Sequence, residues 1–256
     1  MKTHSLILVF LILLIAFAPE GYGQKRRSSN KRPQSAASPK SKEVGQTAVV
    51  MDETLSVLRV APSLFADGVQ RMRRGREVRI LGATEADGVK FYKVTAEPKN
   101  YGWVQADAVF GKFRPDDEER LAKLVQAMNG FDQIELAAYY FTLYPDSKFS
   151  PAILLLFGDL CQETAVRLSK DANSRLDRRE MAASAAPMHS YFLNYVGLDR
   201  YRKLGITYRF NASTKAYYYD GASWRKLVEK FGTSPEAAEA RKRLDSLNGR
   251  SQTTAL

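Results

Sequence analysis

Residues 54–110 constrain the fold of this chain more than any other part, because they alternate short β-forming runs with Gly, Pro and Asp. The run Leu55–Pro62 is followed by a charged turn at Arg73–Arg76. Val78 and Ile80 then alternate with Arg79, the two-residue period of a half-buried strand. In Phe91–Val94, Tyr92 and Val94 share one face, and Phe91 and Lys93 share the other. We therefore predict a small, strand-rich domain in this part of the chain.

A second feature of this region is Gly102-Trp103-Val104, where a glycine directly before a tryptophan indicates a turn or a close approach of two backbones. Together with Leu55–Pro62, the Arg74-Gly75 turn and Phe91–Val94, it resembles the bacterial Src-homology-3 (SH3b-type) domain. The resemblance implies a small, partly open SH3-like β-barrel at residues 47–112. It also implies an exported protein, because the family occurs mostly in exported proteins and often in contact with the cell wall.

Two departures from the family fall where its ligand groove would lie, so the ligand is not carried over. The run Leu55–Pro62 has one residue more than the usual motif, and Phe91 stands where the family usually has tryptophan. We predict that Phe91, Tyr101 and Trp103 line a shallow aromatic groove for an extended peptide or glycan strand. The alternative is that Trp103 fills the barrel core or seals its end.

Residues 1–23 have the pattern of a signal peptide. A short basic start precedes the apolar run Leu6–Ala18, which is shorter than the roughly 20 residues that a membrane-spanning helix needs. The small residues of Gly21–Gly23 predict cleavage before Gln24 and an extracytoplasmic location, in the periplasm or cell envelope or secreted. The basic cluster Lys25–Arg27 leaves an uncleaved membrane anchor as the alternative.

Residues 24–46 are predicted to form a disordered basic linker, because they are rich in Ser, Lys, Arg and Pro and contain almost no large apolar side chain. Residues 24–45 carry a net charge of +6 out of the chain's +11, so the rest is only mildly basic. We interpret the linker as a solvated tether. Electrostatic contact with an anionic envelope surface is the alternative. We expect no nucleic acid, because no aromatic residue is interleaved to stack on bases.

From Pro115 onward the pattern changes to helix, and we predict a helical domain at residues 113–249. Apolar residues recur at helical spacing in four runs. These runs are Leu121, Leu124, Val125 and Met128; Ile134, Ala137, Ala138 and Phe141; Leu154, Phe157, Cys161 and Leu168; and Trp224, Leu227, Val228 and Phe231.

Two further elements complete the predicted α+β, multidomain fold. β-forming residues on both sides of Asn211–Thr214 predict one β-hairpin inserted among antiparallel helices. A last helix starts at a capping box of Thr233 and Glu236 and ends at Gly249, followed by a frayed tail at 250–256.

Two helix junctions, Tyr144–Ser147 and Phe231–Ser234, resemble the turns between helices in tetratricopeptide-like envelope proteins. A regular array of such units would repeat about every 34 residues, and these junctions are much further apart. The likeness therefore implies only helical hairpins packed side by side, a kind of surface that usually binds other proteins.

The chain has one cysteine, Cys161, and two histidines, His4 and His189. These counts exclude an intramolecular disulfide and a zinc site of thiolate and imidazole ligands. Cys161 lies in an apolar stripe and His189 stands among aromatic residues, so we interpret both as structural. We predict no catalytic residue, no metal and no cofactor.

The sequence favours an exported, non-catalytic binding or scaffold protein of the bacterial cell envelope. Its barrel and helical region would each dock a protein or a peptidoglycan-type cell-wall ligand. Two alternatives stay open. One is a cell-wall-modifying hydrolase or its regulatory subunit, because such enzymes often carry bacterial SH3 domains and because carboxylates are plentiful. The other is a structural spacer tethered by its basic arm.

Overall fold

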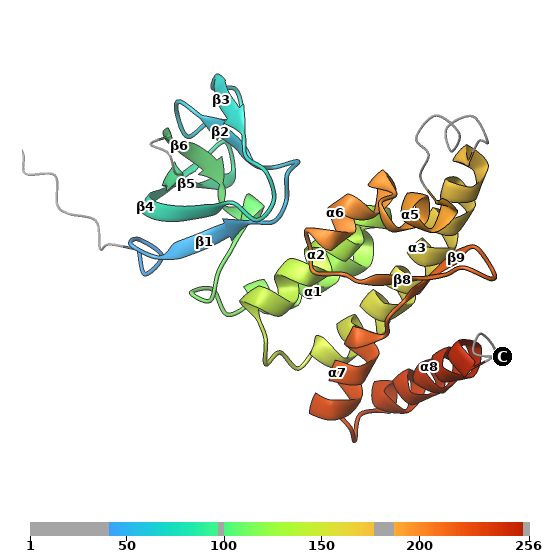
Figure 1. The fold of residues 1–256 in the computed structure, drawn as a ribbon. Coiled ribbons are helices and arrows are strands. Elements are labelled where there is room, and N and C mark those ends of the chain that lie inside the picture. The colour runs from blue at the N-terminus through green and yellow to red at the C-terminus, as the bar shows by residue number, and fades with distance from the viewer. Residues whose placement is uncertain (1–40, 97–99, 177–186, 253–256) are drawn as a thin grey trace, which may run out of the picture. The chain divides into compact units, whose positions relative to one another are not determined.

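The structure is a computed structural model that describes residues 41–96, 100–176 and 187–252, and its fold is α+β (Figure 1). A seven-stranded antiparallel sheet comes first in the described chain, and helices with a two-stranded hairpin follow. The predicted signal peptide at residues 1–23 and most of the predicted linker lie outside the described residues. In the part that is described, no helix is long and apolar enough to cross a membrane.

The sheet has the strand order β3-β2-β6-β5-β4-β1-β7, and its strands curl around a hydrophobic cluster (Figure 1). The neighbouring strands pair in antiparallel register throughout. The strands are β1 (Thr47–Val50), β2 (Val57–Arg59), β3 (Gly68–Arg71), β4 (Glu77–Ala86), β5 (Val89–Ala96), β6 (Asn100–Gln105) and β7 (Val109–Phe110).

The predicted alternation in β4 and β5 is confirmed. Ile80 on β4 and Tyr92 and Val94 on β5 are fully buried in the cluster inside the sheet. Arg79 and Lys93, which alternate with them, are exposed. Successive side chains of a strand point to opposite faces, so one face of the sheet forms the core and the other is turned outward.

Helices and the hairpin form the rest of the described chain. A short 3-10 turn, η1 (Ala106–Ala108), joins β6 to β7, and a second one, η2 (Val196–Leu198), precedes α6. The helices are α1 (Asp117–Ala127), α2 (Gly130–Leu143), α3 (Ser150–Arg175), α5 (Met188–Leu193), α6 (Asp199–Arg202), α7 (Ala222–Lys230) and α8 (Pro235–Gln252), and the hairpin strands are β8 (Tyr208–Asn211) and β9 (Ala216–Tyr219).

The helical spacing correctly identified the buried side of these helices. Leu121 of α1, Ile134 of α2, Cys161 of α3 and Trp224 of α7 all belong to one hydrophobic cluster. The predicted hairpin is also present, with β8 and β9 paired antiparallel. The apolar stripe at a period near 3.6 residues is therefore what packs these helices together.

The end of the chain differs from its prediction in two details. The Ser234 hydroxyl, and not that of Thr233, accepts a hydrogen bond from the Ala237 N–H at 3.2 Å. Helix α8 continues to Gln252, so the start of the predicted frayed tail is helical. Gly249 does not stop the helix, because a glycine inside a helix costs only about 1 kcal/mol.

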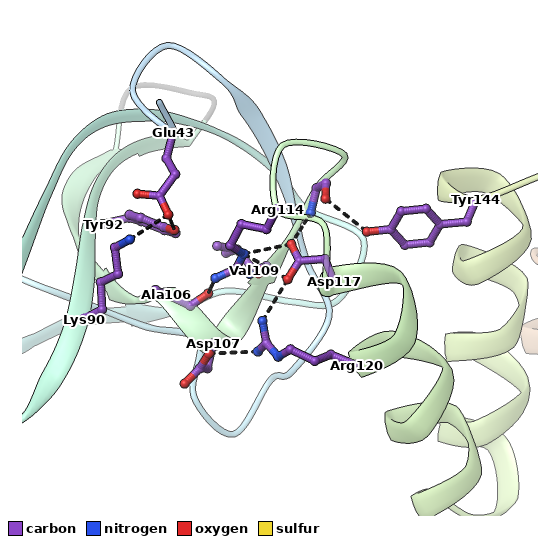
Figure 2. Close-up of polar contacts among 11 residues, drawn as sticks. Glu43, Lys90, Tyr92, Ala106, Asp107, Val109, Arg114, Asp117, Arg120 and Tyr144 are labelled. Carbon is purple, nitrogen blue, oxygen red and sulfur yellow. Dashed lines mark hydrogen bonds and ion pairs between the residues drawn. The ribbon is translucent and has the colours of Figure 1, made fainter. Parts of the chain in front are cut away.

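Residues 41–46, which the sequence assigns to the disordered linker, form a turn against the sheet instead. The Glu43 carboxylate accepts hydrogen bonds from the Lys90 ammonium at 2.6 Å and from the Tyr92 hydroxyl at 2.7 Å (Figure 2). Burial acts to raise the pKa of Glu43, but hydrogen bonds from Lys90, Ser41 and Tyr92 outweigh it and lower the pKa from 4.5 to about 2. One carboxylate with donors on β5 thus orders a segment whose composition favours disorder.

A buried carboxylate joins the sheet to the first helix (Figure 2). Asp117, at the start of α1, is fully buried and accepts hydrogen bonds from the Gly111 N–H at 2.9 Å, from Arg114 Nε at 2.9 Å and from Arg120 Nη1 at 2.8 Å. Arg114 also donates to the Ala106 carbonyl at 3.1 Å. This network fixes the segment between β7 and α1.

A second junction forms where the turn between β3 and β4 lies on α2. The buried Arg74 side chain donates to the Met51 carbonyl at 3.0 Å and pairs with Glu135 of α2 at 2.7 Å. Gly75 has φ +80°, and a Cβ there would lie 2.1 Å from the Tyr139 hydroxyl oxygen. Glycine is therefore required at this turn both for its backbone angle and for the space beside α2.

The Asp117 network predicts a difference between two neighbouring acids. We expect Asp117→Asn to lower the free energy of unfolding by about 3 kcal/mol, because Arg114 and Arg120 lose a buried, hydrogen-bonded counter-charge. Asp116→Asn is the matched control, since Asp116 is exposed and its side chain makes no capping hydrogen bond. Urea unfolding measures both variants, and an equal effect of the two would contradict the role given to Asp117.

The lowered pKa of Glu43 predicts a pH dependence of stability. Its contribution is present above pH 4.5, where the carboxylate is ionised in both states, and is lost as the pH falls toward 2. Between pH 6 and pH 2, the free energy of unfolding of the wild type should fall by about 1 kcal/mol more than that of Glu43→Gln. The difference is modest because the Glu43–Lys90 pair is partly solvated. Glu85→Gln, an exposed control on β4, should lose as much as the wild type.

Candidate binding surface

Two of the three predicted groove residues share the outer face of β6. Gly102 and Val104 are buried on the inner side, so Tyr101 and Trp103 point outward. Tyr101 is 61% exposed, and Trp103 is partly exposed and belongs to neither hydrophobic cluster. Trp103 therefore does not fill the core of the sheet.

The third predicted residue, Phe91, is placed differently. It pairs with Gln105 of β6, which puts it on the same outer side as Trp103, yet it is fully buried. A fully buried ring offers no accessible atom to a ligand, so the prediction that Phe91 lines the groove is wrong. The alternation predicts the side to which Phe91 points, but not its burial, which depends on residues elsewhere in the chain.

Trp103 has a cationic neighbour on each side. In register, it pairs with Arg59 of β2 and with Lys93 of β5. Paired residues of adjacent strands point to the same face, and the strands lie about 4.8 Å apart. At the middle of this face, the Trp103 side chain therefore lies between the guanidinium group of Arg59 and the ammonium group of Lys93.

The loop after β2 adds exposed apolar side chains that sequence reasoning missed. Val60 is 63% exposed and Phe65 is 88% exposed. Arg59, at the end of β2, pairs with Trp103 of β6. Because the two strands are antiparallel, Tyr101, which lies two residues before Trp103, is level with the start of this loop. We refer to Arg59, Val60, Phe65, Tyr101 and Trp103 as the β2–β6 surface.

Hydrogen bonds hold this loop in one conformation. Arg59 Nη1 donates to the Ala66 carbonyl at 2.7 Å. The Asp87 carboxylate, at the turn between β4 and β5, accepts hydrogen bonds from the Ser63 hydroxyl at 2.7 Å and the Leu64 N–H at 2.8 Å, which lower the pKa of Asp87. An ordered loop loses less conformational entropy when it binds a partner.

Gly102 makes this arrangement possible through a close approach of β2 and β6, as its position before Trp103 predicted. A Cβ at Gly102 would lie 2.6 Å from Leu58 Cγ and 2.8 Å from the Arg59 carbonyl oxygen. Leu58 therefore packs directly over the glycine on the inner side, while Trp103 stays outside.

A separate pocket of about 180 Å³ lies among the helices. Its wall is mainly apolar, with Asp220, Ser223 and Lys226 as polar members, and it is lined by Phe141, Leu154, Phe157, Leu204, Gly205, Ile206, Thr207, Tyr219, Asp220, Ala222, Ser223 and Lys226. An apolar cavity of about 150 Å³ accommodates benzene. The volume of this pocket is thus similar to that of one small aromatic ring, but its lining also includes the polar residue Thr207.

Three groups considered for chemistry, Asp117, Cys161 and His189, have the following surroundings. Asp117, the fully buried carboxylate, has its oxygens occupied by donors of the chain itself. Burial raises the pKa of the Cys161 thiol, which disfavours the reactive thiolate, and His189 is exposed beside the Phe210 ring. Within the described residues, no three His, Cys, Asp or Glu side chains are grouped to hold a metal ion.

Comparison with known proteins adds no relative from which a function could be transferred. No family model, no curated protein and no solved structure matches this chain. The functional argument therefore depends on the residues of the surface.

The geometry of β6 predicts that its glycine matters more for stability than its tryptophan. Gly102→Ala should cost about 2–3 kcal/mol, because the added methyl group meets Leu58 and a backbone carbonyl. Trp103→Ala should cost about 2 kcal/mol, less than a core tryptophan, since its ring is partly exposed and belongs to neither hydrophobic cluster, and Tyr101→Ala should stay within about 0.5 kcal/mol. Urea unfolding gives all three, and a larger loss for Trp103→Ala than for Gly102→Ala would make the tryptophan structural.

Proposed function

We propose that this chain is an exported, non-catalytic binding or scaffold protein of the bacterial cell envelope. In this proposal the sheet is a bacterial SH3-like barrel whose β2–β6 surface docks an extended partner, either a protein segment or a peptidoglycan-type strand. The helical region, with its loosely tetratricopeptide-like junctions, offers a second docking place at the pocket beside α7.

The observation that carries the proposal is the outward pair Tyr101 and Trp103 beside the ordered loop with Phe65. Side chains of this size are usually buried, and aromatic residues that stay exposed together are enriched where proteins bind partners. The ordered loop supports the same conclusion, because the surface exists before the partner arrives.

The extracytoplasmic location is part of the proposal and is supported by the pattern of residues 1–23. The basic residues between 24 and 40 would tether the folded part to an anionic envelope surface. We propose no catalytic role, because the buried carboxylate and the thiol described above serve the fold.

Sedimentation with purified peptidoglycan tests the cell-wall form of the proposal. We expect the chain without residues 1–23 to sediment with peptidoglycan in 0.5 M salt, where electrostatic attachment through the linker is screened over about 4 Å. The double variant Tyr101→Ala and Trp103→Ala should lose at least about ten-fold in affinity, since aromatic anchors of a binding surface commonly contribute more than 1 kcal/mol each.

Tyr218→Ala, on the hairpin, is the control that changes a tyrosine far along the chain from this surface. It should sediment like the wild type.

Crosslinking in the native host tests the protein form of the proposal in the same variants. Release of soluble wall fragments would favour a hydrolase, and binding that is unaffected by the double variant would remove the β2–β6 surface from the proposal.

A further inference from the structure

The outer face of the strands around Trp103 has a marked excess of positive charge. Arg59, Arg71, Arg79 and Lys93 all point to this side, as their alternation with buried residues and their cross-strand pairing require. In the described parts of β2 to β6, Glu77 is the one carboxylate on the same side. The whole chain from residue 46 onward is only mildly basic, so this bias is local.

The charges and the aromatic rings lie in two adjacent rows. Lys93, Trp103 and Arg59 form one row across three strands. Arg79 and Tyr101 lie in the next row, since both are aligned with the same residue of β5. Rows on one face of a strand are about 6.8 Å apart. A single extended ligand that contacts Trp103 and Tyr101 can therefore also reach cationic groups in both rows.

Two of these cations, Arg79 and Lys93, are exposed to a ligand, and Arg59 is half-buried. Among the described residues, Arg59, Arg79 and Lys93 form no ion pair with a carboxylate. Arg59 uses Nη1 for the Ala66 carbonyl, while its Nε is buried without a hydrogen-bond partner in the described chain. Exposed cations without a carboxylate partner beside the partly exposed Trp103 ring favour an anionic partner.

We propose that the β2–β6 surface binds an extended acidic peptide segment. Carboxylates of the segment would pair with Arg59 and Lys93, and an apolar side chain between them would contact Trp103 and Tyr101. The exposed Val60 and Phe65 favour a peptide over an anionic glycan, because they suit apolar side chains. This inference rests on the proposed function, since it names the partner of the same surface.

Fluorescence titration with two matched peptides tests the inference. The probes are a 12-residue peptide that alternates Glu with Leu and Phe, and its counterpart with Gln in place of Glu. Trp103 is the reporter, because the other tryptophan, Trp224, is 2% exposed and does not reach the peptide. Trp103→Phe should abolish the signal.

We expect the full chain to bind the Glu peptide at least about ten-fold more tightly than the Gln peptide at low ionic strength, and the difference to shrink in 0.5 M salt. Lys93→Gln should weaken binding of the Glu peptide about three-fold, and Arg59→Gln with Lys93→Gln about ten-fold. Arg73→Gln is the control, since Arg73 is exposed in the turn between β3 and β4, outside the two rows.

Lys93→Gln is the informative single variant because Lys93 is exposed and holds no loop in place, whereas Arg59 anchors the loop at Ala66. Equal binding of the two peptides, or an unchanged affinity in Lys93→Gln, would overturn the inference while leaving the surface as a docking site. Hyaluronate binding that depends on Lys93, with no binding of the Glu peptide, would assign the surface to an anionic glycan. Failure of all three probes, together with no sedimentation and no crosslinked partner, would remove the proposed function itself.

Discussion

The buried carboxylate of Asp117 is the constraint on which the arrangement of the described chain depends. A carboxylate taken out of water is costly unless several donors surround it, and here the donors come from Gly111, Arg114 and Arg120. These residues can meet at one point only if the chain leaves β7 and enters α1 in one way. The hydrophobic cluster follows this path, since Phe110 packs with the side chains of α1 and α2.

The outer aromatic face is a consequence of tight packing on the other side of the same strand. Leu58 occupies the space that a side chain at position 102 would need, so the inner face is filled without the tryptophan. Trp103 therefore lies on the outer face between Arg59 and Lys93. The loop after β2 is held in place by hydrogen bonds such as the one from the Ser63 hydroxyl to Asp87. The Trp103 ring is partly exposed and belongs to neither hydrophobic cluster.

Local patterns in the sequence predicted the elements and much of what each buries. The two-residue period placed Tyr92 inside and Lys93 outside, and the helical period placed Cys161 in the core. The same reasoning failed where the outcome depends on residues far apart in the chain. Glu43 orders the end of the predicted linker by accepting hydrogen bonds from Lys90 and Tyr92 on β5. The burial of Phe91 cannot be predicted from the residues of its own strand.

The candidate surface was predicted in part for the same reason. Tyr101 and Trp103 were proposed as groove residues from the resemblance of Gly102-Trp103-Val104 and its neighbouring motifs to the bacterial SH3 family, which is carried by short runs of the sequence. Arg59 was not, since its place beside Trp103 is set by the pairing of β2 with β6. The exposure of Phe65 was missed because it depends on the conformation of the loop after β2. Charge matching across strands becomes visible only when the register is known.

The isolation of Cys161 gives the molecule an internal reporter. It is the one thiol of the chain and is fully buried in the helical core, so an alkylating reagent reaches it only when that core opens. The alkylation rate therefore follows the opening of the helices, while the rate of change in Trp103 emission follows the sheet in a Trp224→Phe chain, which lacks the tryptophan of the helical core. Agreement between the two rates would mean that sheet and helices open as one cooperative unit, and a faster thiol reaction would mean that the helices open while the sheet stays intact.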